Sequence, residues 1–152
     1  VSSSRIRTAL EQSLPEKAAQ LLGRNYSLEG VVIKGDQRGR TIGFPTANLQ
    51  VNEPTKLIPG KGVYATACRV YGKSYPSMTN IGVRPTVGGS SLSIETHLLN
   101  FEGDLYGKEM ELTFLSFLRD EQKFSGLEAL KDQLAKDQTA SLEIHQKFSD
   151  FH

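Results

Sequence analysis

The sequence has a single cysteine, Cys68, so no disulfide can form within the chain. This cysteine lies in an apolar run, which indicates a small buried hydrophobe rather than a reactive thiol. No segment approaches the roughly 20 apolar residues of a membrane-spanning helix, and no charged-then-apolar leader opens the chain. These absences predict a protein of the reducing cytoplasm with no membrane partner.

An excess of charge of either sign is also missing, because 18 Lys and Arg residues stand against 17 Asp and Glu residues. A nucleic-acid-binding barrel normally exposes aromatic residues beside clustered Lys and Arg, whereas the seven Phe and five Tyr here are scattered. We therefore expect no nucleic-acid partner. His97, His145 and His152 are too far apart to resemble a zinc site, so metal chemistry based on nitrogen and sulfur ligands is not indicated.

What the sequence does contain is a series of short strand-like segments. The 152 residues suit one domain with a real core, and six segments show the alternation of strands. They are Leu28–Ile33, Pro45–Val51, Gly62–Val70, Tyr75–Ile81, Leu92–Leu99 and Met110–Leu118. Because no helical segment separates them, we predict a mainly β protein built on a six-stranded antiparallel barrel, which leaves few exposed edges.

Short helices are expected at the N-terminal end of the chain. Residues 4–22 have helical spacing, which Pro15 interrupts. Ser13 followed by Glu16 is a capping-box pattern, so we predict two short helices, the second of which ends at Gly23.

A helical segment is also expected at the C-terminal end. Residues 125–150 have helical spacing, with Ser125 and Glu128 as a second capping box. Asp137 is a residue type that can cap a new turn, so a restart of the helix is expected there. An amphipathic helix packed against a barrel needs no further function.

Two connections between strands suggest different roles. Residues 67–74 fit a loose P-loop pattern, but a P-loop needs a following helix whose N-terminus helps to hold the phosphate. A strand containing Pro76 follows instead, so we predict a tight hairpin at Tyr71–Ser74. The longer connection Asn100–Gly107 is a candidate lid over the barrel mouth.

A glycine-rich stretch before the second strand suggests phosphate binding. Gly39 and Gly43 flank Arg40, Thr41 and Ile42, and this bare main chain can approach an anion and offer it N–H donors. The stretch predicts a phosphate cradle, although an ordinary turn before a strand has the same composition. Arg40 either assists the cradle or is a solvated loop cation.

The residues after this stretch suggest a metal site. Pro45 fixes its own φ and biases the preceding residue to extended geometry, so a strand should follow. Thr46, Asn48 and Gln50 then share one face, with same-face neighbours roughly 6.6 Å apart at the backbone. The Thr46 hydroxyl and the Asn48 amide oxygen can therefore converge on one hydrated Mg²⁺. Neither is expected in the core, and the alternative for Thr46 is an ordinary strand hydroxyl.

Glu95 lies in a segment whose alternation places the apolar residues on one face and Ser93, Glu95 and His97 on the other. The pattern alone assigns Glu95 to the solvent face, and a functional role requires this face to line a cleft at the barrel mouth. Asn80, on the neighbouring strand, is also compatible with a turn-capping residue.

The same stretches, in their order and spacing, resemble the motifs of riboflavin kinases. They are Gly39–Leu49, Gly62–Tyr64, Asn80–Thr86, Glu95–Leu99 and Phe117–Glu121. The resemblance covers about residues 25–148 and is strongest to the kinase module of bacterial bifunctional riboflavin kinase/FMN adenylyltransferases.

This resemblance implies a Greek-key-like riboflavin kinase barrel over residues 25–152, with residues 1–24 as a helical linker from a missing upstream FMN adenylyltransferase module. The implied reaction is Mg²⁺-dependent transfer of the γ-phosphate of ATP to riboflavin, giving FMN and ADP, with Glu95 as catalytic base. The candidate nucleotide-binding residues are Gly39, Arg40, Thr41, Ile42, Gly43, Pro45, Thr46 and Asn80. The candidate metal ligands are Thr46 and Asn48, and the candidate flavin-binding residues are Arg119, Gly103, Asp104, Leu105 and Tyr106. The alternative is a non-catalytic flavin- or nucleotide-binding barrel, since one architecture serves many functions.

Overall fold

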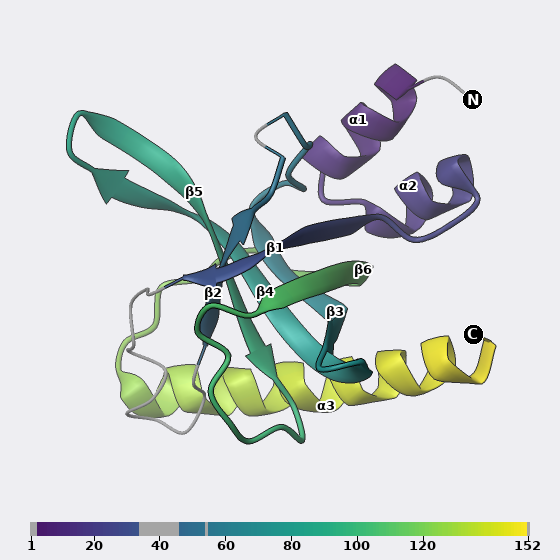
Figure 1. The fold of residues 1–152 in the computed structure, drawn as a ribbon. Coiled ribbons are helices and arrows are strands. Elements are labelled where there is room, and N and C mark those ends of the chain that lie inside the picture. Colours follow the sequence, from purple (N-terminus) through teal and green to yellow (C-terminus); the bar gives the residue numbers. More distant parts are fainter. Residues whose placement is uncertain (1–2, 34–45, 54, 152) are drawn as a thin grey trace.

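The computed structural model of the protein describes residues 3–33, 46–53 and 55–151. Three helices and six strands make up this part of the chain (Figure 1). In order they are α1 (Ser3–Glu11), α2 (Pro15–Leu22), β1 (Ser27–Ile33), β2 (Ala47–Val51), β3 (Gly62–Val70), β4 (Lys73–Thr86), β5 (Gly89–Leu98), β6 (Glu109–Arg119) and α3 (Leu127–Phe151).

The strands form a closed barrel in the order β1-β2-β5-β4-β3-β6, and every neighbouring pair is antiparallel. β3, β4 and β5 follow one another as hairpins, whereas β2 lies beside β5 and β6 closes the barrel between β3 and β1. The prediction of a six-stranded antiparallel, Greek-key-like barrel is confirmed.

β4 and β5 are longer than their alternation predicted. Their pairing continues to Thr86 and Gly89, so the two strands project from the barrel as a hairpin at the upper left of Figure 1. Pro76 lies inside β4 opposite Ala67, and its carbonyl accepts a hydrogen bond of 2.8 Å from the Leu99 amide. A proline lacks only the N–H, so its carbonyl can still join the backbone hydrogen bonding of the barrel.

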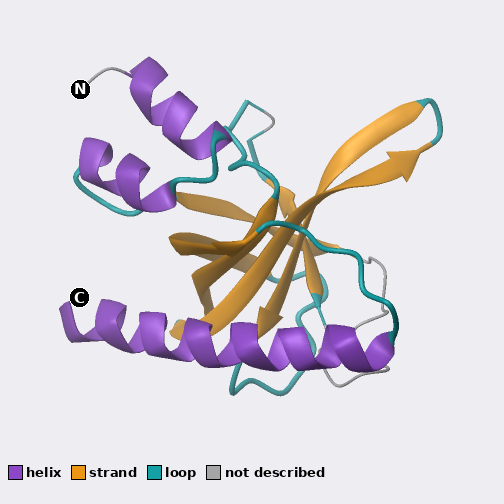
Figure 2. Ribbon diagram, turned by 180° about the vertical axis from the view of Figure 1, so that it is seen from behind, coloured by secondary structure: helices purple, strands orange, loops and turns teal. Residues whose placement is uncertain are grey.

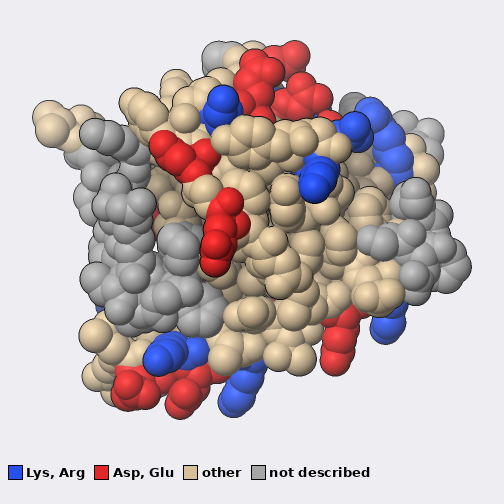
Figure 3. Space-filling model, turned by 60° about the horizontal axis from the view of Figure 1, so that its bottom comes forward, with Lys and Arg blue, Asp and Glu red and all other residues tan. Residues whose placement is uncertain are grey.

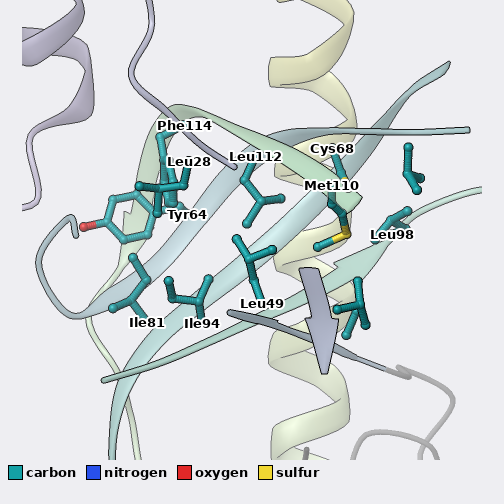
Figure 4. Close-up of a cluster of buried hydrophobic side chains, with 13 residues drawn as sticks. Leu28, Leu49, Tyr64, Cys68, Ile81, Ile94, Leu98, Met110, Leu112 and Phe114 are labelled. Carbon is teal, nitrogen blue, oxygen red and sulfur yellow. The ribbon is translucent and has the colours of Figure 1, made fainter. Parts of the chain in front are cut away.

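Alternate residues of the strands fill the barrel with apolar side chains, and Figure 4 shows part of this core in close-up. Tyr64 is fully buried, meets the Phe114 ring edge-on at 5.2 Å, and donates its hydroxyl hydrogen to the Gly60 carbonyl at 2.6 Å. Cys68 is also fully buried, and burial raises the pKa of its thiol to about 12. The thiol therefore stays neutral, and its prediction as a small buried hydrophobe is confirmed.

The barrel interior also contains a chain of hydroxyl groups. The Thr66 hydroxyl lies 2.7 Å from that of Ser77 and 2.8 Å from that of Thr79, which in turn lies 2.9 Å from that of Thr96. All four side chains are fully buried. Because each hydroxyl has a partner within the chain, these polar groups can be buried without a large desolvation penalty.

The long helix α3 packs on the outside of the barrel against β3, β4 and β6 (Figure 2). It begins at Leu127, so Gly126 rather than Ser125 immediately precedes it, and it is continuous to Phe151. The predicted restart at Asp137 is wrong. Asp137 lies within the helix and is 4% exposed, because its carboxylate pairs with Arg119 of β6 instead of capping a turn.

The N-terminal helices break at Pro15 and end at Gly23, as predicted. Gly23 takes the left-handed conformation with φ 79° and donates to the Ala19 carbonyl, which caps α2. The capping box is wrong, because the N-cap position of α2 is Leu14 and has no side-chain cap bond. Ser13 instead donates to a carbonyl of the β2–β3 connection, so its hydroxyl is not available to α2.

The predicted hairpin between β3 and β4 is confirmed. Tyr71 and Gly72 form its tip, both with positive φ values of 54° and 73°, as the tight turn of an antiparallel hairpin requires. A strand follows this turn, so residues 67–74 have the wrong context for a P-loop.

Candidate functional site

The site predictions from three separate motifs meet on the outer face of the barrel. Residues aligned across neighbouring strands form one row through all six strands. Its pairs are Ile33↔Asn48, Asn48↔Glu95, Glu95↔Asn80, Asn80↔Val63 and Val63↔Arg119. Directly paired residues of antiparallel strands point to the same side, with Cβ atoms about 5 Å apart. The barrel therefore brings Asn48, Glu95 and Asn80 together.

These three side chains differ in their exposure. Asn48 is 4% exposed, Glu95 is half-buried and Asn80 is exposed. The Ser93 hydroxyl donates to Glu95 Oε1 at 3.4 Å, which helps to orient the carboxylate. Alternation alone predicted that Glu95 lies on the solvent face. The structure shows instead that its side chain is half-buried. The expectation that Asn48 lies outside the core is wrong, because its outward-facing side chain is covered.

Thr46 is partly buried and lies one residue before the start of β2. Ala47 and Leu49 point into the barrel core, so Asn48 and Gln50 share the outer face, as predicted. The predicted phosphate cradle lies outside the described residues. Its members are Gly39, Arg40, Thr41, Ile42 and Gly43, and Pro45 lies outside the described residues as well.

Arg119 ends the row and is held by α3. Its Nε donates to both carboxylate oxygens of Asp137 at 3.1 and 3.0 Å, and its Nη2 donates to Oδ2 at 2.8 Å. Gln133 Nε2 donates to Oδ1 of the same carboxylate at 3.1 Å. The Arg119 guanidinium also lies 5.7 Å from the centre of the Phe124 ring. This group is therefore fixed in position, and Asp137 is the partner that the sequence reasoning missed.

The other predicted flavin residues lie at the opposite end of β6. Gly103, Asp104, Leu105 and Tyr106 precede β6, whereas Arg119 is its last residue. β6 has eleven residues, so its ten rises of about 3.4 Å separate the two groups by roughly 34 Å along the strand. The structure therefore does not bring this predicted set together.

The loop that contains these residues is attached to the β3–β4 hairpin. The Tyr71 hydroxyl donates to the Asp104 carbonyl at 2.8 Å, and Tyr71 stacks on Phe101 with ring centroids 6.1 Å apart. The Asp104 carboxylate accepts from the Tyr106 amide at 3.0 Å, and Leu105 packs against the barrel core. The predicted lid is thus anchored to the end of the barrel formed by this hairpin.

A second carboxylate, that of Glu121, lies against Gly82 of β4. A Cβ added to Gly82 would lie 2.7 Å from Glu121 Oε2, so the Glu121 carboxylate occupies the space that a side chain would need. Gly82 is the register partner of Ser93, which donates to Glu95. Glu121 ends the segment Phe117–Glu121, which resembles a riboflavin kinase motif, but the sequence pattern alone predicts no role for this residue.

Within residues 3–33, 46–53 and 55–151, no group of three or more His, Cys, Asp or Glu side chains could hold a metal ion. Among the helices that the structure describes, none has the length and apolarity to cross a membrane. The face in Figure 3 carries Lys and Arg side chains interspersed with Asp and Glu around a largely uncharged centre. The even charge balance of the sequence is thus also seen on this face.

Comparisons with known proteins agree on one family. The model of the flavokinase (riboflavin kinase) family matches residues 22–145. The chain is 46% identical over 151 residues to a bifunctional riboflavin kinase/FMN adenylyltransferase of Listeria monocytogenes, which covers 99% of this chain and 48% of the relative. The chain therefore spans about half the length of the curated relatives that it matches.

Two solved structures share the fold. A Streptococcus pneumoniae structure described as a macrolide-efflux protein superposes with a TM-score of 0.87 at 35% identity, over 93% of this chain and 46% of its own. The riboflavin kinase of Trypanosoma brucei superposes with a TM-score of 0.54 at 27% identity, over 80% of this chain and 77% of its own. Together with the family match over most of the chain, this shows that the chain belongs to the riboflavin kinase family.

Proposed function

We propose that this chain is a riboflavin kinase, which transfers the γ-phosphoryl group of ATP to the terminal ribityl hydroxyl of riboflavin and releases FMN and ADP. The observation that carries this proposal is the cross-strand row in which Glu95 lies between Asn48 and Asn80. This row supports the proposal, because Glu95, the candidate base, is paired on one side with the candidate metal ligand Asn48 and on the other with the candidate nucleotide contact Asn80. Positioning of this kind supplies most of the catalysis in phosphoryl transfer.

Glu95 is the group that takes the proton. The ribityl oxygen attacks the γ-phosphorus, the bond from this phosphorus to the β–γ bridging oxygen breaks, and ADP leaves with that oxygen. The hydroxyl proton passes to the Glu95 carboxylate late in the step, because a carboxylate is too weak a base to ionise an alcohol beforehand. The Ser93 hydroxyl holds Oε1, which favours a fixed orientation of the carboxylate.

Mg·ATP binding involves the residues around the start of β2. The Thr46 hydroxyl and the Asn48 amide oxygen fit Mg²⁺, an ion that prefers oxygen ligands and relies on water and phosphate for the rest of its shell. Bound there, the ion would supply positive charge that stabilises the negative charge of the phosphates. The segment 34–45, which contains Gly39–Gly43, connects Ile33, the register partner of Asn48, to Thr46. Both of its attachment points therefore lie beside the proposed metal ligands, which supports a phosphate-binding role for Gly39–Gly43.

Riboflavin would extend from Glu95 along the row towards Arg119. Three strand spacings of about 4.8 Å lie between the two residues, which is roughly 14 Å along the wall of the closed barrel. The ribityl chain separates the flavin ring from the reacting hydroxyl, so a cation at this distance suits the ring end of the substrate. The loop residues Gly103–Tyr106 remain a prediction for flavin binding.

The intact protein has a second module in this proposal. The curated relatives are named as bifunctional and are about twice as long as this chain. Residues 1–24 would then link an upstream FMN adenylyltransferase module to the kinase barrel at residues 25–152, in a cytoplasmic enzyme. Hydrogen bonds from the Gly60 amide to the Leu10 carbonyl and from the Phe117 amide to Glu16 tie this helical segment to the barrel.

The experiment that tests the function is an assay of the purified chain with riboflavin, ATP and Mg²⁺, with flavins separated by chromatography. FMN is expected without FAD, and excess chelator should abolish its formation. ADP in place of ATP serves as the control. If the chain binds riboflavin but forms no FMN, the kinase proposal fails and the chain is a non-catalytic flavin-binding module. If this chain alone forms FAD, the two-module proposal is contradicted.

A further inference from the structure

The Arg119–Asp137 ion pair joins the last residue of β6 to the middle of α3. The Arg119 side chain is 14% exposed and the Asp137 side chain is 4% exposed. Replacing a buried ion pair by well-packed apolar residues is often neutral or stabilising, because two charges must be desolvated to form the pair. Stability alone therefore does not account for a carboxylate buried at this point of an otherwise packing helix.

The geometry instead fixes the orientation of the guanidinium. Asp137 receives Nε and Nη2 in a two-pronged pair, the Asp120 carbonyl receives Nη1 at 3.2 Å, and Phe124 lies against the group. Gln133 in turn holds one oxygen of Asp137. The described residues thus engage three of the five guanidinium N–H groups, and a planar fork held in this way has little rotational freedom.

This orientation matters because of where Arg119 lies. It is in register with Asn80 and Glu95 around the wall of the closed barrel through Val63, which is buried, and α3 packs on the outside of β3, β4 and β6. A guanidinium pinned on one edge presents its remaining N–H groups in a fixed direction, which suits the recognition of planar carbonyl and ring-nitrogen acceptors such as those of a flavin.

We infer that Asp137 is a positioning residue for riboflavin, which acts by holding the Arg119 guanidinium at the ring end of the substrate. The inference rests on the proposed function, because it gives Arg119 a part in holding riboflavin. The inference extends the proposed riboflavin site to a residue of α3, although the sequence pattern predicts only a packing role for this helix. Since Arg119 lies far from the reacting hydroxyl, the effect of Asp137 falls on riboflavin affinity rather than on turnover or on ATP.

The test compares Asp137→Asn with Asp132→Asn, which makes the same chemical change at an exposed position of the same helix. For Asp137→Asn we expect the riboflavin KM to rise about 10-fold, and the riboflavin Kd measured by fluorescence quenching to rise by the same factor. The kcat and the KM for Mg·ATP should stay within about twofold of the values of the unchanged chain. Asp132→Asn should match the unchanged chain. An unchanged riboflavin KM in folded Asp137→Asn overturns the inference.

A double-mutant cycle separates positioning from mere stability. Arg119→Lys keeps the charge but loses the planar fork, so it should also raise riboflavin KM, and adding Asp137→Asn to it should raise KM by less than about twofold more. Additive effects, or losses in kcat and both KM values that track a lower thermal midpoint, would assign Asp137 a structural role only. If Asp137→Asn does not fold, Asp137→Glu keeps the charge and shifts the carboxylate by one methylene group, and the same split between riboflavin and ATP is expected.

Failure of the proposed function is recognised separately. If the unchanged chain binds riboflavin but forms no FMN, the kinase proposal fails, and the riboflavin Kd values of the variants decide the role of Asp137. If the unchanged chain binds no riboflavin, both proposals are overturned.

Discussion

The two faces of strands β4 and β5 both carry polar side chains, but they arrange them differently. On the inner face, the Thr79 hydroxyl bonds to its partners on β3 and β5 at 2.8 and 2.9 Å, and all of these groups are fully buried. On the outer face, Asn80 is exposed and Glu95 is half-buried, with the Ser93 hydroxyl 3.4 Å away.

A polar side chain on a barrel strand therefore indicates a functional role only when it is known whether it points into the barrel or outward. Inward hydroxyls must satisfy one another, because no solvent reaches them, and their spacing then serves the fold. An outward group such as Asn80 is exposed to solvent and does not depend on a buried partner. Residues 79 and 80 are neighbours in sequence, yet these roles assign one to stability and the other to the proposed site.

The largest effect that would sharpen this comparison is expected for Glu95→Gln. The amide keeps the shape and a hydrogen-bonding end but cannot take the proton, so kcat should fall roughly 10²–10⁴-fold with riboflavin and ATP binding little changed. Steady-state kinetics together with flavin fluorescence quenching measure both quantities. Near-normal turnover in the folded variant would show that Glu95 is not the catalytic base.

Thr46→Ala tests the metal-binding end of the outer face. Loss of one oxygen ligand should weaken the use of Mg·ATP by on the order of 1–3 kcal/mol, seen as a lower kcat/KM for Mg·ATP, with the thermal midpoint nearly unchanged. Asn48→Ala should show the same kinetic loss and also a lower midpoint, because Asn48 is buried. If Thr46→Ala unfolds the chain while its folded fraction keeps full activity, Thr46 is a structural hydroxyl.

Thr79→Val tests the inner face. Valine has nearly the same shape but leaves the Thr96 hydroxyl without the partner it has here, so the free energy of unfolding should fall by on the order of 1–2 kcal/mol. Activity per folded molecule should not change. Urea unfolding and kcat, each compared with the unchanged chain, measure the two. A loss of kcat without a loss of stability would break the division between the faces.

The smallest effect concerns His145, a polar residue of α3. Burial lowers the pKa of its imidazole, so below the ordinary value of about 6.5 the unfolded chain binds this proton more readily than the folded chain. Stability contributed by the neutral imidazole is therefore lost as the pH falls from about 6.5 to the lower folded pKa. Urea unfolding at pH 7.5 and 5.5 should show a smaller decrease for His145→Gln than for the unchanged chain; an equal decrease would mean that other groups cause it.

Local pattern in the sequence was enough to predict the elements and the class of fold. Period-two alternation between turn residues located the six strands, and Pro15 and Gly23 marked the breaks between helices, because these signals act over a few residues. The family motifs also identified Asn48, Asn80 and Glu95 as candidates. Capping predictions were less reliable, since Ser13 and Asp137 found partners elsewhere in the fold.

Only the tertiary structure decided which candidates meet. Strand register aligned Asn48, Glu95 and Asn80 in one row, and register depends on pairing between segments far apart in sequence. The length of β6 separated Arg119 from the Gly103–Tyr106 loop, although the sequence had grouped them. The partner of Arg119 was equally a matter of packing, because the docking of α3 on the barrel brings a carboxylate 18 residues away to the guanidinium, and no local pattern encodes that contact.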